Sequence, residues 1–138
     1  MGTGVQTRDE VDRLMADTDA AHVHLLFDTG HLYWSGDDPA ALARDHGDRI
    51  AHVHLKDIRP DTMQAADAGG WSFLEGVEQG VFTVPGDGAI DFVSIFAALA
   101  EAGYEGWLIV EAEQDAAKAH PLTYAKMARA YLGEVLGV

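Results

Sequence analysis

The sequence has no cysteine among its 138 residues, which excludes disulfide bonds, thiolate metal ligands and a cysteine nucleophile. Positive charge is scarce: 9 Lys and Arg residues stand against 23 Asp and Glu residues, for a formal net charge of −14. Such acidity argues against a nucleic-acid partner, because proteins usually meet phosphate backbones with a basic face. No apolar run approaches the roughly 20 residues of a membrane-spanning helix, and the first residues lack the apolar core of a signal peptide. We therefore expect a cytoplasmic protein with no membrane or nucleic-acid partner.

What is present is enough apolar sequence, 48% of residues, to bury one core, so residues 1–138 are expected to form one domain or part of one. The pattern predicts strands at residues 23–28, 50–56 and 107–111. Helices are predicted after Thr7, after Asp38, near residues 72–79, after Asp91 and from Pro121 onward, each from capping residues or a helical apolar stripe. Strands that alternate with helices pair in parallel through right-handed crossovers, so the fold class is α/β.

Polar side chains gather where the three predicted strands end. Alternation along IAHVHLK places His52, His54 and Lys56 on one face of the second strand. The first and third strands end in acids, Asp28 and Glu111. Asp28, His54 and Glu111 together suit one divalent metal ion, and a mixed oxygen and nitrogen set favours Mn²⁺, Co²⁺, Fe²⁺ or Zn²⁺ over Ca²⁺. The alternative is that both acids cap turns and that His54 is a core histidine.

The residues that alternate with this polar face are expected to point into an apolar layer; they are Ala51, Val53 and Leu55. His24 and His52 are interpreted as buried structural histidines, and Trp34 and Trp71 as packing residues on loops. The PGDG sequence at residues 85–88 lacks the strand and helix context of a dinucleotide fingerprint, so it is interpreted as a turn.

Four blocks in order, LLFDTGHLYWSGDDP, DRIAHVHLKDIRP, GVFTVPGDGAIDF and AGYEGWLIVEAEQD, resemble the xylose-isomerase-like sugar phosphate isomerase and epimerase superfamily. Within it they most resemble the myo-inosose-2 dehydratases. The resemblance implies the C-terminal half of a (β/α)₈ TIM barrel, with three parallel strands corresponding to strands six to eight. It also implies that Met1 is an internal methionine and that a fourth metal ligand lies before it.

The resemblance assigns roles to individual residues. Asp28, His54 and Glu111 match three metal ligands, with Mn²⁺ or Co²⁺ as the expected ion. His31, Lys56 and Glu111 are implied in catalysis, and His31, Lys56 and Arg59 in binding substrate. Each of the binding residues has an alternative: His31 as a solvent-facing turn residue, Lys56 as a lysine at a barrel rim, and Arg59 as a solvated charge. Glu113 is expected beside Glu111 if the strand pleating continues.

The implied function is that of a lyase, the metal-dependent dehydration of inosose in inositol catabolism, with a small polyol or cyclic ketone as substrate. Two alternatives stay open: a sugar isomerase or epimerase with the same metal chemistry, and a non-catalytic fragment. Three parallel strands leave two unpaired edges, so we expect the chain alone to self-associate and to lack activity unless an N-terminal half is supplied.

Overall fold

The computed structural model describes residues 4–137, so Met1, which was interpreted as an internal methionine, lies outside the described residues. The chain divides into two compact units. Unit 1 contains the residues up to His54 together with Asp91–Ile109, and unit 2 contains Leu55–Ile90 together with the residues from Val110 onward. The expectation of one partial barrel domain over residues 1–138 stays a prediction.

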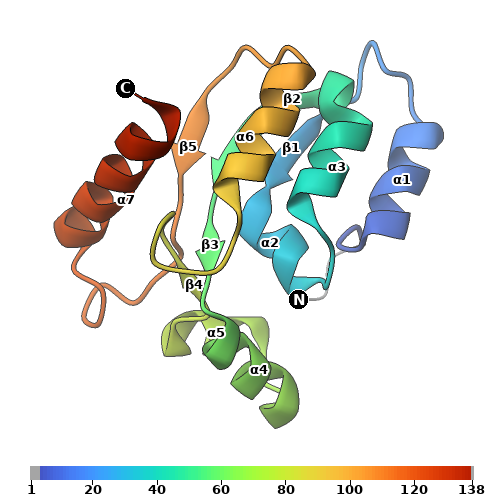
Figure 1. The fold of residues 1–138 in the computed structure, drawn as a ribbon. Coiled ribbons are helices and arrows are strands. Elements are labelled where there is room, and N and C mark those ends of the chain that lie inside the picture. Colours follow the sequence, from blue (N-terminus) through green and yellow to red (C-terminus); the bar gives the residue numbers. More distant parts are fainter. Residues whose placement is uncertain (1–3, 138) are drawn as a thin grey trace. The chain divides into compact units, whose positions relative to one another are not determined.

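A parallel strand pair forms the centre of unit 1 (Figure 1). Strand β1 (Leu25–Asp28) runs beside β2 (Ile50–Leu55), and their register places Asp28 opposite His54. Strand β5 (Leu108–Val110) is the third strand, in the order β1-β2-β5. The three predicted strands are therefore confirmed, each of them shorter than expected.

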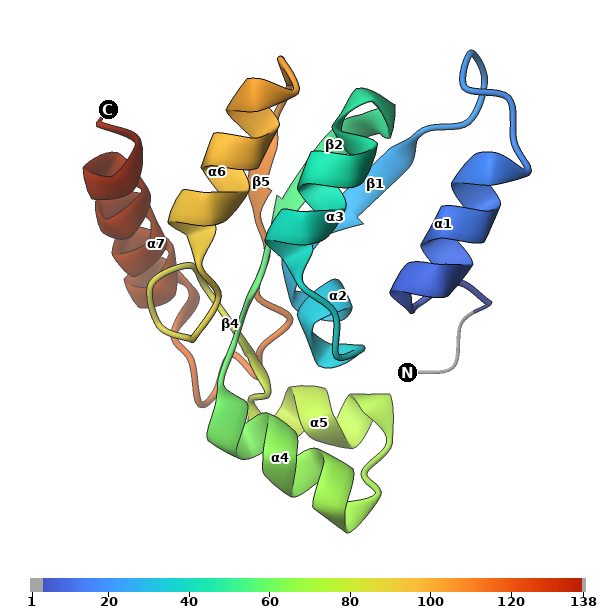
Figure 2. The same cartoon turned by 45° about the vertical axis from the view of Figure 1, so that its right-hand side comes forward.

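Helices α3 (Pro39–His46) and α6 (Phe92–Glu101) of unit 1 pack side by side (Figures 1 and 2). Both begin as their sequences predict, because Asp38 and Asp91 cap them with side-chain oxygens that accept from backbone N–H groups. The approach between α6 and the segment after α3 is close. A Cβ added at Gly47, in the short 3-10 helix η1 (Gly47–Arg49), would lie 2.3 Å from the Cβ of Ala102.

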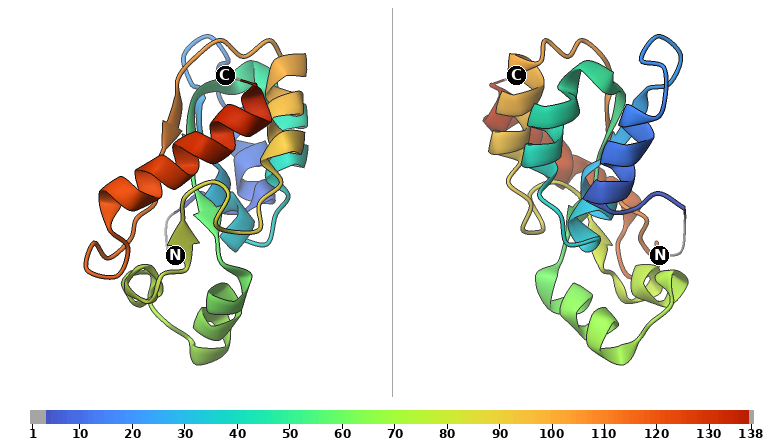
Figure 3. Two further views of the ribbon diagram at one scale, coloured as in Figure 1. Left: turned by 60° about the vertical axis from the view of Figure 1, so that its left-hand side comes forward. Right: turned by 90° about the vertical axis from the view of Figure 1, so that its right-hand side faces the viewer.

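Helix α1 (Arg8–Ala16) lies against α3 and buries Val11 and Met15 (Figure 3). The predicted capping box is present, since the Glu10 carboxylate accepts from the backbone N–H of Thr7 at 2.9 Å. Polar contacts also join α1 to α3: His46 Nε2 lies 2.6 Å from Asp12 Oδ1, and Arg8 binds Asp45.

Unit 2 contains elements that the sequence predicted and elements that it did not. Helix α5 (Phe73–Gln79), capped by Ser72, and helix α7 (Pro121–Leu136) are confirmed. Helix α4 (Pro60–Gly69) was not predicted; it buries only Ala66 and thus has no apolar stripe to reveal it. Helices α4 and α5 form a hairpin (Figure 2). Strands β3 (Asp57–Ile58) and β4 (Phe82–Thr83) are antiparallel and too short to show a period.

Two expectations about burial are wrong. His24 is exposed because β1 begins only at Leu25, after a turn, and Ala51 is exposed although Val53 and Leu55 are buried as predicted. Trp71 does pack as expected, since a Cβ on Gly69 would lie 2.5 Å from its Nε1. Among residues 4–137, no helix has the length and apolar character needed to cross a membrane. The cytoplasmic location stays a prediction.

Candidate functional site

Asp28 and His54 are neighbours in unit 1, at the ends of two adjacent parallel strands. His54 Nδ1 lies 3.6 Å from Asp28 Oδ2, and the two side chains are 23% and 10% exposed. The other carboxylate oxygen of Asp28 accepts from the backbone N–H of His31 at 2.9 Å and so caps helix α2 (Thr29–Trp34). The cap fixes one oxygen of the carboxylate while the other faces the imidazole.

Two further contacts of His54 come from Thr29 and His52. The hydroxyl of the buried Thr29 donates to the carbonyl of His54 at 3.4 Å, and the half-buried ring of His52 meets the His54 ring edge to face at 5.2 Å. His31 is half-buried on α2 and not on an open turn, because Asp28 starts the helix directly after the strand. Its contact with substrate stays a prediction.

Lys56 is almost completely buried in unit 2, with 1% of its surface exposed. Its Nζ lies 2.5 Å from Glu113 Oε2 and 3.2 Å from Glu111 Oε2, and 4.8 Å from the centre of the Phe82 ring. The alternative of a lysine that reaches solvent at a barrel rim is therefore wrong. A buried ammonium needs opposite charge close by, and two glutamates provide it.

Glu111 and Glu113 meet at Lys56 although the strand does not continue to them. Strand β5 ends at Val110, and the backbone N–H of Glu111 donates to the carbonyl of Leu55 at 3.2 Å. Glu113 has a φ of 38°, in the left-handed region that residues other than glycine seldom adopt. The predicted continuation of the pleat is thus wrong, although both carboxylates do meet at the same ammonium.

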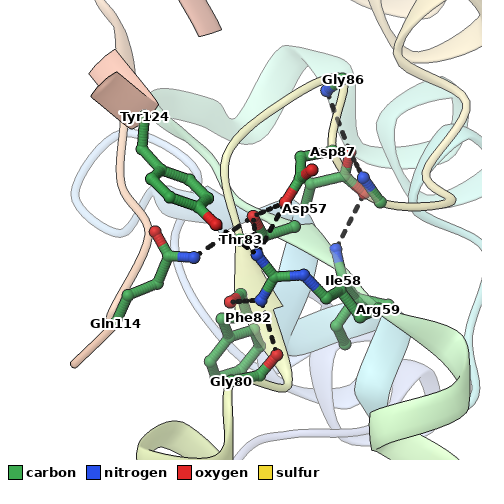
Figure 4. A network of polar contacts seen from close by, with 11 residues as sticks. Asp57, Ile58, Arg59, Gly80, Phe82, Thr83, Gly86, Asp87, Gln114 and Tyr124 are labelled. Atoms are coloured by element: carbon green, nitrogen blue, oxygen red, sulfur yellow. Dashed lines mark hydrogen bonds and ion pairs between the residues drawn. The ribbon is translucent and has the colours of Figure 1, made fainter. Parts of the chain in front are cut away.

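Arg59 is the centre of a polar network in unit 2 (Figure 4). Its guanidinium donates to the carbonyls of Gly80 and Phe82 at 2.8 and 3.2 Å and to the Thr83 hydroxyl at 2.9 Å, and it binds Asp87 at 2.7 Å. The alternative of a solvated charge is wrong, since these contacts join β4 to the loop that follows it. Contact of Arg59 with substrate stays a prediction.

Asp57, which the sequence did not single out, organises the PGDG turn. Its buried carboxylate accepts from the backbone N–H groups of Ile58, Gly86, Gly88 and Ile90, at 2.8, 3.1, 3.1 and 3.0 Å. Burial raises the pKa of the Asp57 carboxyl above its ordinary value, and the four N–H donors offset part of that rise. A Cβ on Gly88 would lie 2.3 Å from Asp57 Oδ1, so the turn needs glycine there. The sequence signals that could have pointed to Asp57 were its place just after a strand and the glycine-rich PGDG turn.

The chain belongs to the xylose isomerase-like TIM barrel family, whose family model matches residues 1–134. This match confirms the fold class and the resemblance carried by the four sequence blocks. Two solved structures share the fold. A xylose isomerase-like TIM barrel/4-hydroxyphenylpyruvate dioxygenase fusion protein has a TM-score of 0.71 at 25% identity, covering 97% of this chain and 20% of that one. The IOLI protein, solved with a bound zinc atom, has a TM-score of 0.65 at 21% identity, covering 94% of this chain and 43% of that one.

Among curated proteins, the chain is similar to inosose dehydratases. It is 57% identical to that of Clostridium beijerinckii over 137 residues, which is 99% of this chain and 46% of that protein. The inosose dehydratase of Geobacillus thermodenitrificans is 54% identical over 138 residues, 100% of this chain and 46% of that protein. The rhizopine catabolism protein MocC of Rhizobium meliloti is 59% identical over 127 residues, 92% of this chain and 39% of that protein. The chain thus spans about half the length of the relatives it matches.

Proposed function

We propose that the chain takes part in the dehydration of inosose, with Asp28, His54 and Glu111 as ligands of a divalent cation. The observation that carries the proposal is the Asp28–His54 pair, a carboxylate and an imidazole 3.6 Å apart at the ends of adjacent parallel strands. Strand ends of this kind are where barrels of this class carry their catalytic groups. The identity of 57% to an inosose dehydratase supports the choice of reaction.

The chemistry of the donors fits such a cation. Bonds to carboxylate oxygen and imidazole nitrogen are about 2 Å long, so two donor atoms 3.6 Å apart can bind one ion. Glu111 belongs to the same set because it follows β5, the neighbour of β2 in the sheet order, and binds the backbone of Leu55, the residue after His54. Mixed oxygen and nitrogen donors suit Mn²⁺ or Co²⁺. When bound, the cation would act as a Lewis acid that stabilises negative charge on substrate oxygens.

The side chains supply the proton transfers. Inosose loses a proton from the carbon next to its ketone, a carbon–carbon double bond forms, and the hydroxyl group of the next carbon leaves. The product is an enol, which converts to the diketone. Glu111 takes the proton as a general base, and His31 or Lys56 protonates the leaving hydroxyl, so that water is released. Arg59 holds substrate oxygens.

The substrate itself needs a direct test, because MocC is as similar to the chain as the inosose dehydratases are. A dehydratase acting on inosose forms a diketone that absorbs in the ultraviolet, whereas an isomerase or epimerase forms none.

The experiment replaces the matched 46% of the Clostridium beijerinckii enzyme with this chain and measures diketone formation from inosose. We expect the chimera to turn over inosose, and Glu111→Gln to reduce its turnover at least 100-fold through loss of the carboxylate base, on the order of known base deletions. Trp34→Phe, a half-buried aromatic on α2, is the matched control and should retain activity. An active Glu111→Gln chimera would show that the assignment of Glu111 is wrong, and a chimera that acts on ketoses but not on inosose would refute the dehydratase.

A further inference from the structure

The ammonium of Lys56 is shared between two glutamates of unit 2. Glu113 is the nearer partner at 2.5 Å, and Glu111 lies at 3.2 Å, both through their Oε2 atoms. Lys56 is almost completely buried while the two carboxylates are 32% and 37% exposed. The ammonium of Lys56 is therefore held in one place. Its distances from the two glutamates decide how strongly it neutralises each carboxylate.

The backbone of Glu113 is in a conformation that needs an explanation. A side chain at a φ of 38° is unfavourable for any residue other than glycine, apart from the short polar residues Asn and Asp. Strained positions of this type persist where the surroundings determine them, and here the side chain closes on a buried ammonium. The strain and the short contact are two independent observations about the same residue.

We propose that Glu113 is a positioning residue, which holds Lys56 in common with Glu111 and thereby keeps Glu111 able to bind a divalent cation. This inference rests on the proposed function, in which Glu111 is a metal ligand. A carboxylate can bind a cation through one oxygen while the other contacts an ammonium. Without Glu113, the buried charge of Lys56 would be balanced by Glu111 alone and would oppose a cation at that carboxylate.

The alternative is that Glu113 attracts a cation only through its own negative charge, and a mutant cycle separates the two explanations. Co²⁺ affinity is measured by calorimetry on the 138-residue chain and on the variants Glu113→Gln, Lys56→Met and the double variant. Asp115→Asn is the control for loss of a nearby carboxylate, since Asp115 is half-buried and accepts from the N–H of Ala117. The absorption spectrum of bound Co²⁺ reports the ligand environment, and the midpoint of thermal unfolding reports the fold.

We expect Glu113→Gln to weaken Co²⁺ binding about tenfold and to change the Co²⁺ spectrum, as supporting groups around metal ligands typically do. Asp115→Asn should change the affinity less than about threefold on the same scale. In the Lys56→Met background, Glu113→Gln should have little effect, because the ammonium through which it acts is gone.

Two results would overturn the inference alone: Co²⁺ affinity unchanged in Glu113→Gln, or the same weakening with and without Lys56. A wild-type chain that binds no Co²⁺ would refute the proposed metal centre and this inference with it. The failures are thus distinguishable, because in the first two cases the wild-type chain still binds the ion. If Glu113→Gln lowers the unfolding midpoint, Glu113→Asp provides the second test. It keeps the charge and accepts the left-handed backbone but is one methylene too short for Lys56, so it should also weaken binding.

Discussion

Two arginines, Arg49 in unit 1 and Arg59 in unit 2, each join separate chain segments but use different partners. Arg49 is buried and donates to the carbonyls of Met15 and Val23, both at 2.9 Å, and to the hydroxyl of Thr18 at 3.1 Å. These acceptors are neutral oxygens. Arg59 also binds two carbonyls, but it adds the carboxylate of Asp87 at 2.7 Å.

The difference extends to the surroundings of the two residues. Within four positions of the sequence, unit 2 fixes Lys56, Asp57 and Arg59, each with charged or N–H partners of its own. In unit 1, α3 and α6 pack together with buried apolar side chains, and Arg49 binds neutral acceptors. A buried charge that loses its partner is more costly than a neutral donor that does so. Unit 2 should therefore be the more sensitive of the two to the removal of one polar group.

The largest effect is expected for Asp57→Asn. The amide keeps the shape but has only one acceptor oxygen, so two of the four backbone N–H groups would face an NH₂ group. We expect the free energy of unfolding to fall by about 3 kcal/mol, since a buried donor left unsatisfied costs roughly 1–3 kcal/mol and the four contacts of Asp57 are buried or part-buried. Urea unfolding measures the change, and hydrogen exchange at Gly86 and Gly88 should show that the loss is local to the PGDG turn. Unchanged stability together with protected amides would mean that the Asp57 contacts contribute nothing.

A smaller effect is expected for Arg49→Lys in unit 1. Lysine keeps the charge but has a single nitrogen, which cannot reach Met15, Thr18 and Val23 together. The loss of hydrogen bonds to neutral acceptors should lower the free energy of unfolding by about 2 kcal/mol. Arg44→Lys, at an exposed position on α3, is the matched control and should change little. A loss in Arg49→Lys greater than that in Asp57→Asn would reverse the order of the two units.

The smallest effect concerns pH, to which Asp12 of unit 1 and Asp57 of unit 2 should respond in opposite directions. The hydrogen bond from His46, followed by that from Arg8, lowers the pKa of the Asp12 carboxyl. Asp12 therefore stabilises the fold at pH values above the ordinary Asp pKa of about 4. This contribution is lost as the pH falls through the lowered pKa of the folded state. The pKa of Asp57 is raised, so its contribution is present at low pH and is lost as the pH rises through the raised value.

Urea unfolding at pH values below and above the ordinary Asp pKa of about 4 tests the contrast. The difference in stability between wild type and Asp12→Asn should shrink on acidification, whereas the difference between wild type and Asp57→Asn should grow. Parallel slopes for the two variants would contradict the opposite pKa shifts.

The strands and most helices could be predicted because their signals are local. Asp38 followed by Pro39, Asp91 before an apolar stripe and Pro121 at a helix start each mark a boundary within a few residues of the sequence. Alternation in β2 and acids at the ends of two other strands likewise singled out Asp28, His54 and Glu111 as candidate ligands.

What could not be predicted depends on contacts between distant segments. The burial of Lys56 depends on Glu111 and Glu113, more than 50 residues further along the chain. The left-handed turn at Glu113 has no glycine or asparagine to mark it. Helix α2 begins directly after the strand residue Asp28, with no loop between strand and helix. The role of Asp57 is visible only once the PGDG turn folds back onto its carboxylate.

Co²⁺ calorimetry on matched histidine variants shows whether Asp28, His54 and Glu111 bind a divalent cation. His52 and His54 lie two residues apart on β2 with their rings in contact, so His52→Gln controls for the loss of an imidazole near the site. We predict that His54→Gln weakens Co²⁺ binding about 100-fold, because the loss of a ligand should cost at least as much as the loss of a supporting group. His52→Gln should stay within about threefold of wild type on the same scale. Equal Co²⁺ affinities of both variants and the wild-type chain would contradict a metal site that includes His54.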